Sequence, residues 1–141
     1  MFIGQFNHHL EEKGRLSVPK KFRSDLASGA ILSQGLDGCL FLYPKATWES
    51  LISRLQALPL TKSDARGFIR NLSYGATEVE IDHIGRILVP EYLRQFAQIE
   101  DACIIAGAID RIEIWSQSKF AAYTKEISST VESIAEKLDL S

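Results

Sequence analysis

Apolar and polar residues alternate with period two in two short stretches near the amino terminus, residues 6–10 and 15–18. Such alternation is typical of β-strands with one buried face. The residues that join the two stretches end in Gly14, which can supply the positive φ of a tight turn. The pattern therefore predicts a β-hairpin, with Arg15 at the start of the returning strand.

The side chains of the second stretch fall into two sets, because neighbours along a strand point to opposite faces. Leu16 and Val18 would face the core, and Arg15 and Ser17 would face away from it. Pro19 cannot donate a backbone hydrogen bond but is well tolerated at the start of a helix. We therefore expect it to end the strand and to begin a short helix.

Farther along the chain, apolar residues recur three and four positions apart in three segments, which predicts three amphipathic helices. The first is closed by Pro59, the second begins at about Ser63, and the third follows Trp115. The apolar positions of the third are Phe120, Tyr123, Ile127, Val131, Ile134 and Leu138. Its first two turns would pack on the protein itself, and its later part would contact a partner or fray.

A thirteen-residue phrase occurs twice, at residues 11–23 and 82–94. The identical pairs are Gly14/Gly85, Arg15/Arg86, Val18/Val89, Pro19/Pro90 and Arg23/Arg94. A repeat of this length indicates one structural unit that is built twice. We expect residues 1–58 to form the first unit, 59–74 a helical linker, and 75–141 the second unit with the last helix.

With 141 residues, of which 45% are hydrophobic, the chain can bury one core shared by two small halves. It has no apolar run long enough to cross a membrane and no signal-peptide pattern, so we expect a cytoplasmic protein that does not contact membranes. Cys39 and Cys103 lie at non-equivalent places in the two repeats and are expected to be packed thiols.

The two copies of the phrase differ in charge. Residues 1–23 hold five lysines and arginines against two glutamates, whereas residues 72–94 hold two arginines against four acidic residues. The first copy is therefore suited to phosphate groups and the second is not. On the outer face, Leu88 takes the position that Ser17 has in the first copy, so we expect the outer surface of the second copy to be covered.

Three histidines raise the question of a metal site. His8 and His9 are neighbours on a predicted strand and so point to opposite faces, and no cluster of cysteines or carboxylates completes a ligand set with them or with His83. The sequence also has no nucleophile elbow, phosphate-binding loop or His–carboxylate set. We therefore expect no metal, no cofactor and no enzymatic activity.

The repeated phrase, acid-x-x-Gly-Arg-apolar-x-apolar-Pro-x-x-apolar-Arg, resembles the AbrB-type swapped-hairpin DNA-binding fold. With its two copies, its opening MFIG and the segment GLDGCLFLYP at residues 35–44, the chain is identified as a member of the MraZ family. The resemblance implies an α+β fold. In it, two tandem, hairpin-rich AbrB/SpoVT-like repeats form a pseudo-twofold β-barrel core with peripheral helices.

The resemblance also implies a function. Members of this family are DNA-binding transcriptional regulators of the division and cell-wall gene cluster, and we expect a repressor. They bind short direct repeats with runs of G upstream of their own operon, and they do so as ring-shaped oligomers. The implied partners are therefore double-stranded promoter DNA and further copies of the chain, at the nucleoid.

The same resemblance assigns the DNA contact to basic hairpin loops that enter the major groove. In the first copy this loop holds Lys13, Gly14 and Arg15, and an arginine at its tip can bond the O6 and N7 atoms of guanine. Lys13 would contact phosphate groups, as would Lys20 and Lys21. Such contacts add affinity but little sequence information.

The family's acid-x-x-x-Arg pair falls on Glu11 and Arg15 in the first copy and on Asp82 and Arg86 in the second. Glu11 is one methylene longer than the usual aspartate, so its contact with the arginine is less secure. Arg86 would either contact DNA or, paired with its acid, brace its loop or a subunit interface. Arg23 is expected among the phosphate contacts.

Two other interpretations stay open. The chain could be an oligomeric assembly or adaptor protein without specific DNA binding, in which the acid–arginine pairs and the last helix make protein contacts. It could also be an antitoxin-like regulator of the same fold. Such regulators normally have one hairpin copy and a disordered toxin-binding tail, so the second copy counts against this interpretation.

Overall fold

The computed structural model describes residues 1–139 of the chain. The first part contains β1 (Gln5–His9), η1 (Glu12–Gly14), β2 (Arg15–Ser17), η2 (Lys20–Phe22), η3 (Ser24–Leu26), β3 (Ala30–Gln34), β4 (Leu40–Pro44), α1 (Lys45–Gln56) and α2 (Ser63–Tyr74). The second part contains β5 (Thr77–Val79), β6 (Arg86–Leu88), α3 (Glu91–Ala97), β7 (Ala102–Gly107), β8 (Ile112–Ser116) and α4 (Gln117–Leu138). The three helices predicted from apolar spacing are confirmed as α1, α2 and α4.

The short helix predicted after Pro19 forms as two 3₁₀ turns, η2 and η3, whereas its counterpart α3 is a regular α-helix. The difference has a local cause. Ser24 and Asp25 in the first copy favour caps and turns over helix interiors, since their side chains compete for backbone hydrogen bonds. The second copy has Gln95 and Phe96 at these positions, and its helix continues to Ala97.

Six strands form one antiparallel sheet in the order β1-β7-β8-β4-β3-β5, and β2 and β6 form a separate two-stranded antiparallel sheet. The equivalent strands of the two repeats are β1 and β5, β2 and β6, β3 and β7, and β4 and β8. When each is exchanged for its equivalent, the six-strand order reads the same from the other end, and the two-stranded sheet is unchanged. The fold is thus α+β with the pseudo-twofold symmetry that the repeat predicts. The larger sheet is open at β1 and β5, so the strands of residues 1–139 do not close the expected barrel.

The predicted hairpin between residues 6–10 and 15–18 is wrong, although both stretches are extended. β1 pairs with β7, and β2 pairs with β6, so each strand takes its partner from the other repeat. Lys13 and Gly14 both have positive φ, 64° and 79°, in the turn that carries the chain from one sheet to the other. Period-two alternation predicts a strand and its buried face, but it does not determine the partner of that strand.

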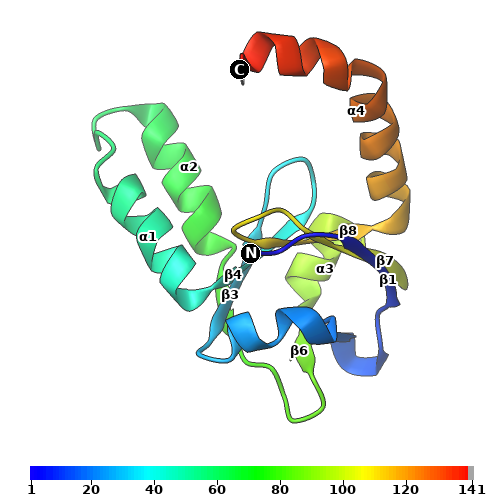
Figure 1. Cartoon of the computed structure of the whole chain (residues 1–141). Coiled ribbons are helices and arrows are strands. Elements are labelled where there is room, and N and C mark those ends of the chain that lie inside the picture. Colours follow the sequence, from blue (N-terminus) through cyan, green and yellow to red (C-terminus); the bar gives the residue numbers. More distant parts are fainter. Residues whose placement is uncertain (140–141) are drawn as a thin grey trace.

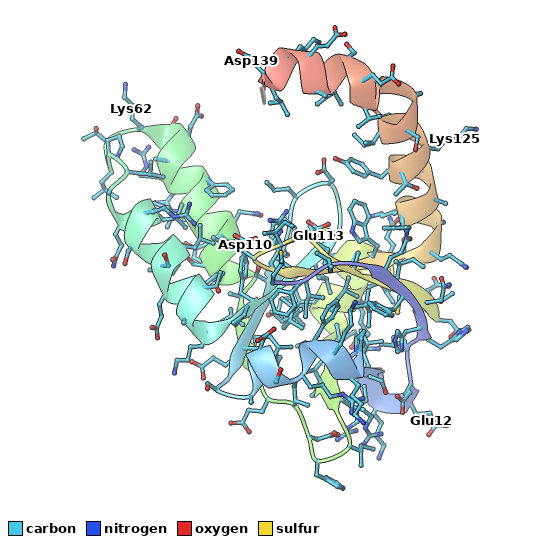
Figure 2. All side chains as sticks on the ribbon, viewed as in Figure 1. Glu12, Lys62, Asp110, Glu113, Lys125 and Asp139 are labelled. Atoms are coloured by element: carbon cyan, nitrogen blue, oxygen red, sulfur yellow. The ribbon has the colours of Figure 1, made fainter. Side chains whose placement is uncertain are left out.

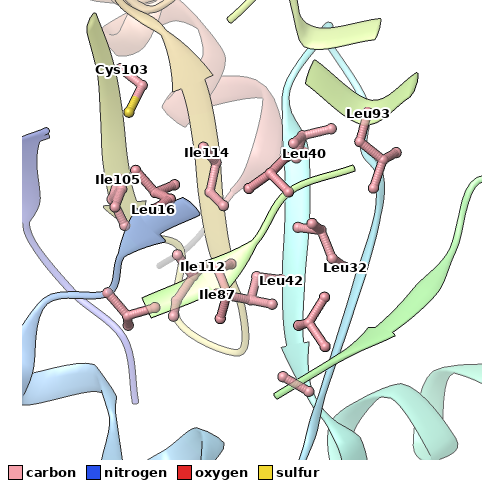
Figure 3. Close-up of a cluster of buried hydrophobic side chains, with 14 of the residues drawn as sticks. Leu16, Leu32, Leu40, Leu42, Ile87, Leu93, Cys103, Ile105, Ile112 and Ile114 are labelled. Carbon is pink, nitrogen blue, oxygen red and sulfur yellow. The ribbon is translucent and has the colours of Figure 1, made fainter. Parts of the chain in front are cut away.

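The β2–β6 sheet, hereafter the ribbon, packs against one face of the larger sheet (Figure 1). Leu16 and Ile87 face each other at the centre of the ribbon, and each is 1% exposed. Figure 3 shows them among side chains of the larger sheet, namely Leu32, Leu40, Leu42, Ile105, Ile112 and Ile114. The predicted inward positions of the repeated phrase are therefore confirmed, and they hold the ribbon on the core.

The opposite face of the larger sheet carries a second cluster around Phe41, Tyr43 and Trp115, which α1 and α4 cover. The Trp115 ring lies 5.9 Å from that of Phe120 and 5.2 Å from that of Tyr123, centroid to centroid, so the first turns of α4 pack on the protein as predicted. Farther along α4, Val131 is 49% and Leu138 63% exposed. None of the helices within residues 1–139 is long and apolar enough to cross a membrane.

The glycines of the repeated phrase join the two copies through the backbone. Gly14 and Gly85 have φ of 79° and 88°. The carbonyl of Gly85 accepts a hydrogen bond from the amide of Val18 at 2.9 Å, and that of Gly14 accepts one from the amide of Val89 at 2.8 Å. Each loop thus ends the strand of the other copy.

The last arginine of each phrase completes this exchange. Arg23 donates through Nε to the carbonyl of Val18 at 2.9 Å, and its guanidinium fills the space in which a Cβ of Gly85 would lie. Arg94 donates through Nε to the carbonyl of Val89 at 3.0 Å, and its guanidinium packs on Gly14. These reciprocal contacts explain why glycine and arginine occur at the same places in both copies.

Replacement of Gly85 by alanine should destabilise the protein by about 1–3 kcal/mol, because it puts a side chain at positive φ and into the Arg23 guanidinium. Gly67→Ala is the matched control, since Gly67 lies within α2 with open space where its Cβ would be. That change should stabilise the helix by roughly 0.5–1 kcal/mol. Urea unfolding of the wild type and the two variants measures both changes in stability. If Gly85→Ala is as stable as the wild type, Arg23 does not pack on Gly85 as described.

Candidate nucleic-acid interface

The outer face of the ribbon displays two cross-strand pairs. Arg15 of β2 lies directly opposite Leu88 of β6, and Ser17 of β2 lies opposite Arg86 of β6. Arg15, Ser17 and Arg86 are partly exposed, and Leu88 is 50% exposed. As predicted, these residues point away from the core, so the ribbon presents two arginines on one surface.

The loops that precede the two strands have the same backbone hydrogen bonds. The amide of Glu11 donates to the carbonyl of Arg15 at 2.8 Å, and the amide of Asp82 donates to that of Arg86 at 2.8 Å. The amide of Gly14 donates to the backbone carbonyl of Glu11 at 3.2 Å, and the amide of Gly85 donates to that of Asp82 at 3.0 Å. Differences between the two arginines must therefore arise from side chains.

The Asp82 carboxylate is held by three hydrogen bonds within its own loop. Its Oδ1 accepts from the amides of Ile84 at 3.1 Å and Arg86 at 2.9 Å, and its Oδ2 accepts from Nε of Arg86 at 3.1 Å. The backbone hydrogen bond from Arg86 is the main cause that lowers the pKa of Asp82 below 3.8. Asp82 thus braces the loop and fixes the direction of the arginine.

Glu11 does not repeat this arrangement. Its Oε2 accepts a hydrogen bond from the hydroxyl of Ser17 at 3.1 Å, and its Oε1 lies 3.4 Å from Nη1 of Arg86, an ion pair across the ribbon. The expected pair between Glu11 and Arg15 is therefore absent from the part of the chain that the structure describes. The longer glutamate side chain and the exchange of strands together bring its carboxylate to the second copy.

Two carboxylates thus converge on Arg86, and none reaches Arg15. Within residues 1–139 the Arg15 guanidinium has no hydrogen-bond or ion-pair partner. Lys13, at the turn that precedes it, is exposed and also lacks an ion pair in that range. The ribbon therefore has one neutralised end, around Arg86, and one cationic end, around Arg15.

The other predicted residues of the first copy fall into different roles. Lys20 is exposed, and the ammonium of Lys21 lies over the rings of Phe6 and Phe22, 5.1 and 5.6 Å from their centroids, which orients it. Gly14 is buried and uses its amide and carbonyl within the protein, so its role is conformational.

Arg23, which we expected among the phosphate contacts, instead packs between the repeats. Sequence reasoning missed this role and the Glu11–Arg86 contact. The sequence contained a signal for the role of Arg23, because its equivalent in the second, acidic copy is also an arginine, Arg94.

The turn that precedes β2 lies away from the α1–α2 connection and from the end of α4 (Figure 2). Glu12, beside Lys13, lies at one side of the molecule in Figure 2, whereas Lys62 between α1 and α2 and Asp139 after α4 lie toward the other.

The histidines and cysteines do not form a competing site. His9 pairs with Asp101 at 3.0 Å, and residues 1–139 hold no group of three potential metal ligands. Cys39 and Cys103 are both buried, as predicted, and burial raises the pKa of their thiols to about 12 and about 11. These thiols are therefore protonated at neutral pH and unreactive.

Replacement of Asp82 by asparagine should lower the stability of the protein at pH 7, because the folded state lowers the pKa of this carboxyl. The contribution of such a group is present above its unfolded-state pKa and is lost as the pH falls through the folded-state value. Urea midpoints of the variant and the wild type should thus differ at pH 7 and converge as the pH falls through the folded-state pKa of Asp82. Asp25→Asn, which removes an exposed charge from η3, controls for net charge. A difference that persists undiminished at low pH would contradict this role.

Comparisons with known proteins agree with the repeat architecture. The MraZ family model, described as "MraZ protein, putative antitoxin-like", matches residues 1–71 and again residues 72–140. A Limosilactobacillus reuteri protein is 46% identical over 140 residues, which cover 99% of this chain and 99% of its own length. Proteins of Heliobacterium modesticaldum and Moorella thermoacetica are 45% and 42% identical over 138 residues, or 98% of this chain and 96% of each relative. All three are named transcriptional regulator MraZ, and this chain belongs to the MraZ family.

Proposed function

We propose that this protein is a sequence-specific DNA-binding transcriptional regulator that reads guanine with Arg15. The proposal rests on the guanidinium of Arg15, which lies on the outer face of the ribbon and with which no carboxylate within residues 1–139 pairs. A two-stranded ribbon fits the major groove, and an arginine there can bond O6 and N7 of guanine in bidentate fashion. The names of the relatives support the same function.

The basic residues around Arg15 supply the sequence-independent part of binding. Lys13, Lys20 and the oriented Lys21 are exposed cations of the same copy and would contact phosphates. Such contacts position a protein on the duplex and make its affinity depend on salt. In this proposal Arg86 does not read a base, because Asp82 and Glu11 already bind its guanidinium.

The proposal extends to the assembly and its target. One ribbon offers few contacts, whereas a ring of copies would present several ribbons to successive direct repeats and gain about 10²–10⁴ in avidity. We propose such a ring, bound to G-containing repeats upstream of its own operon in the division and cell-wall cluster, with repression as the outcome. Its place would be the nucleoid of the cytoplasm.

The alternative is an assembly or adaptor protein without specific DNA binding. The observation that favours it is the exposed apolar stripe of α4, with Val131 and Leu138. Salt separates the two functions. DNA affinity should fall with a log–log slope of about −0.9 per phosphate neutralised, whereas apolar association should respond weakly.

Arg15→Ala should remove the preference for a labelled duplex from the DNA upstream of the protein's own gene. The expected loss is about 5–150-fold for each repeat occupied, the equivalent of ~1–3 kcal/mol per bidentate contact. Arg86→Ala is the matched control, and it should keep the preference over a scrambled duplex because its guanidinium is already paired. Fluorescence anisotropy measures the affinities, and size-exclusion chromatography confirms that oligomer size is unchanged. Wild-type affinity in Arg15→Ala would refute the assignment.

A further inference from the structure

Leu88 is an apolar side chain in a polar setting. It stands on the outer face of the ribbon, 50% exposed, and Arg15 lies directly opposite it on β2. Directly opposed residues of an antiparallel pair share a face, with Cβ atoms about 4.5–5.5 Å apart. Whatever Arg15 binds on this face therefore also lies beside Leu88.

The other end of the ribbon lacks this combination. There Ser17 stands opposite Arg86, its hydroxyl donates to Glu11, and the same glutamate pairs with the arginine. Polar groups at that end satisfy one another. At the Arg15 end, a guanidinium without a hydrogen-bond or ion-pair partner in residues 1–139 stands opposite a leucine that is 50% exposed.

The major groove offers one apolar group on the edges of the four bases, the C5 methyl of thymine. Successive base pairs are about 3.4 Å apart, so a side chain about 5 Å from the base-reading arginine reaches a neighbouring base pair. Building on the proposed function, we infer that Leu88 determines specificity by contacting the methyl group of a thymine next to the guanine that Arg15 reads. The two repeats would then read adjacent bases, one from each strand of the ribbon.

The test exchanges thymine for deoxyuracil, which removes only the methyl group, at one position at a time in one repeat of the duplex upstream of the gene. For the wild type, one such exchange should weaken binding about fourfold, the effect of returning one methyl-sized group to water. Leu88→Ala, which removes the contact from every copy, should bind the unmodified duplex about fourfold more weakly for each repeat occupied and show no further loss at that position. Leu36→Ala, which truncates a leucine of similar exposure in the β3–β4 turn, should keep the wild-type pattern.

The outcomes separate the two proposals. If the wild type prefers its duplex but Leu88→Ala shows the same penalty for deoxyuracil, or no exchange weakens the wild type, the inference about Leu88 is wrong and the proposed function stands. If Leu88→Ala instead loses the oligomer while keeping the thymine pattern, Leu88 belongs to a contact between copies, and the inference is again wrong. If the wild type does not distinguish its duplex from a scrambled one, both fall together.

Discussion

The reciprocal packing of arginine on glycine between the two repeats is the contact on which the ribbon depends. Arg23 lies against Gly85 and Arg94 against Gly14, and each glycine carbonyl also receives the amide that ends the other copy's strand. The ribbon itself has only three residue pairs, and so short a sheet is not stable alone. It persists because these contacts and the buried Leu16–Ile87 pair fix it to the larger sheet.

The backbone is symmetric, but the side chains on its surface are not. Both loops have the same hydrogen bonds, yet Glu11 crosses the ribbon to Arg86, which Asp82 already holds. One arginine thereby becomes part of the scaffold, and the other, Arg15, remains available. The two copies thus keep the same loop backbone while the surroundings of their arginines differ.

Local pattern in the sequence was enough to predict much of this structure. Apolar spacing located the long helices, and alternation in the repeated phrase identified Leu16 and Val18 as buried. The strand partners could not be predicted, since alternation is the same whether a strand pairs with its neighbour or with the other repeat. For the same reason the acid–arginine pair of the first copy was assigned within the loop, whereas Glu11 contacts the second copy. The roles of Arg15 and the lysines remain proposals.

In the proposed function, Arg15 reads guanine and its counterpart Arg86 does not. The most direct measurement is the affinity for operator duplexes in which single guanines are replaced by 7-deazaguanine, which lacks the N7 acceptor. If Arg15 reads guanine, one replacement weakens the wild type and Arg86→Ala equally. It does not weaken Arg15→Ala further, because that variant has already lost the contact. If instead the penalty persists in Arg15→Ala and disappears in Arg86→Ala, the two carboxylates do not neutralise the second arginine for DNA, and the assignment of roles is reversed.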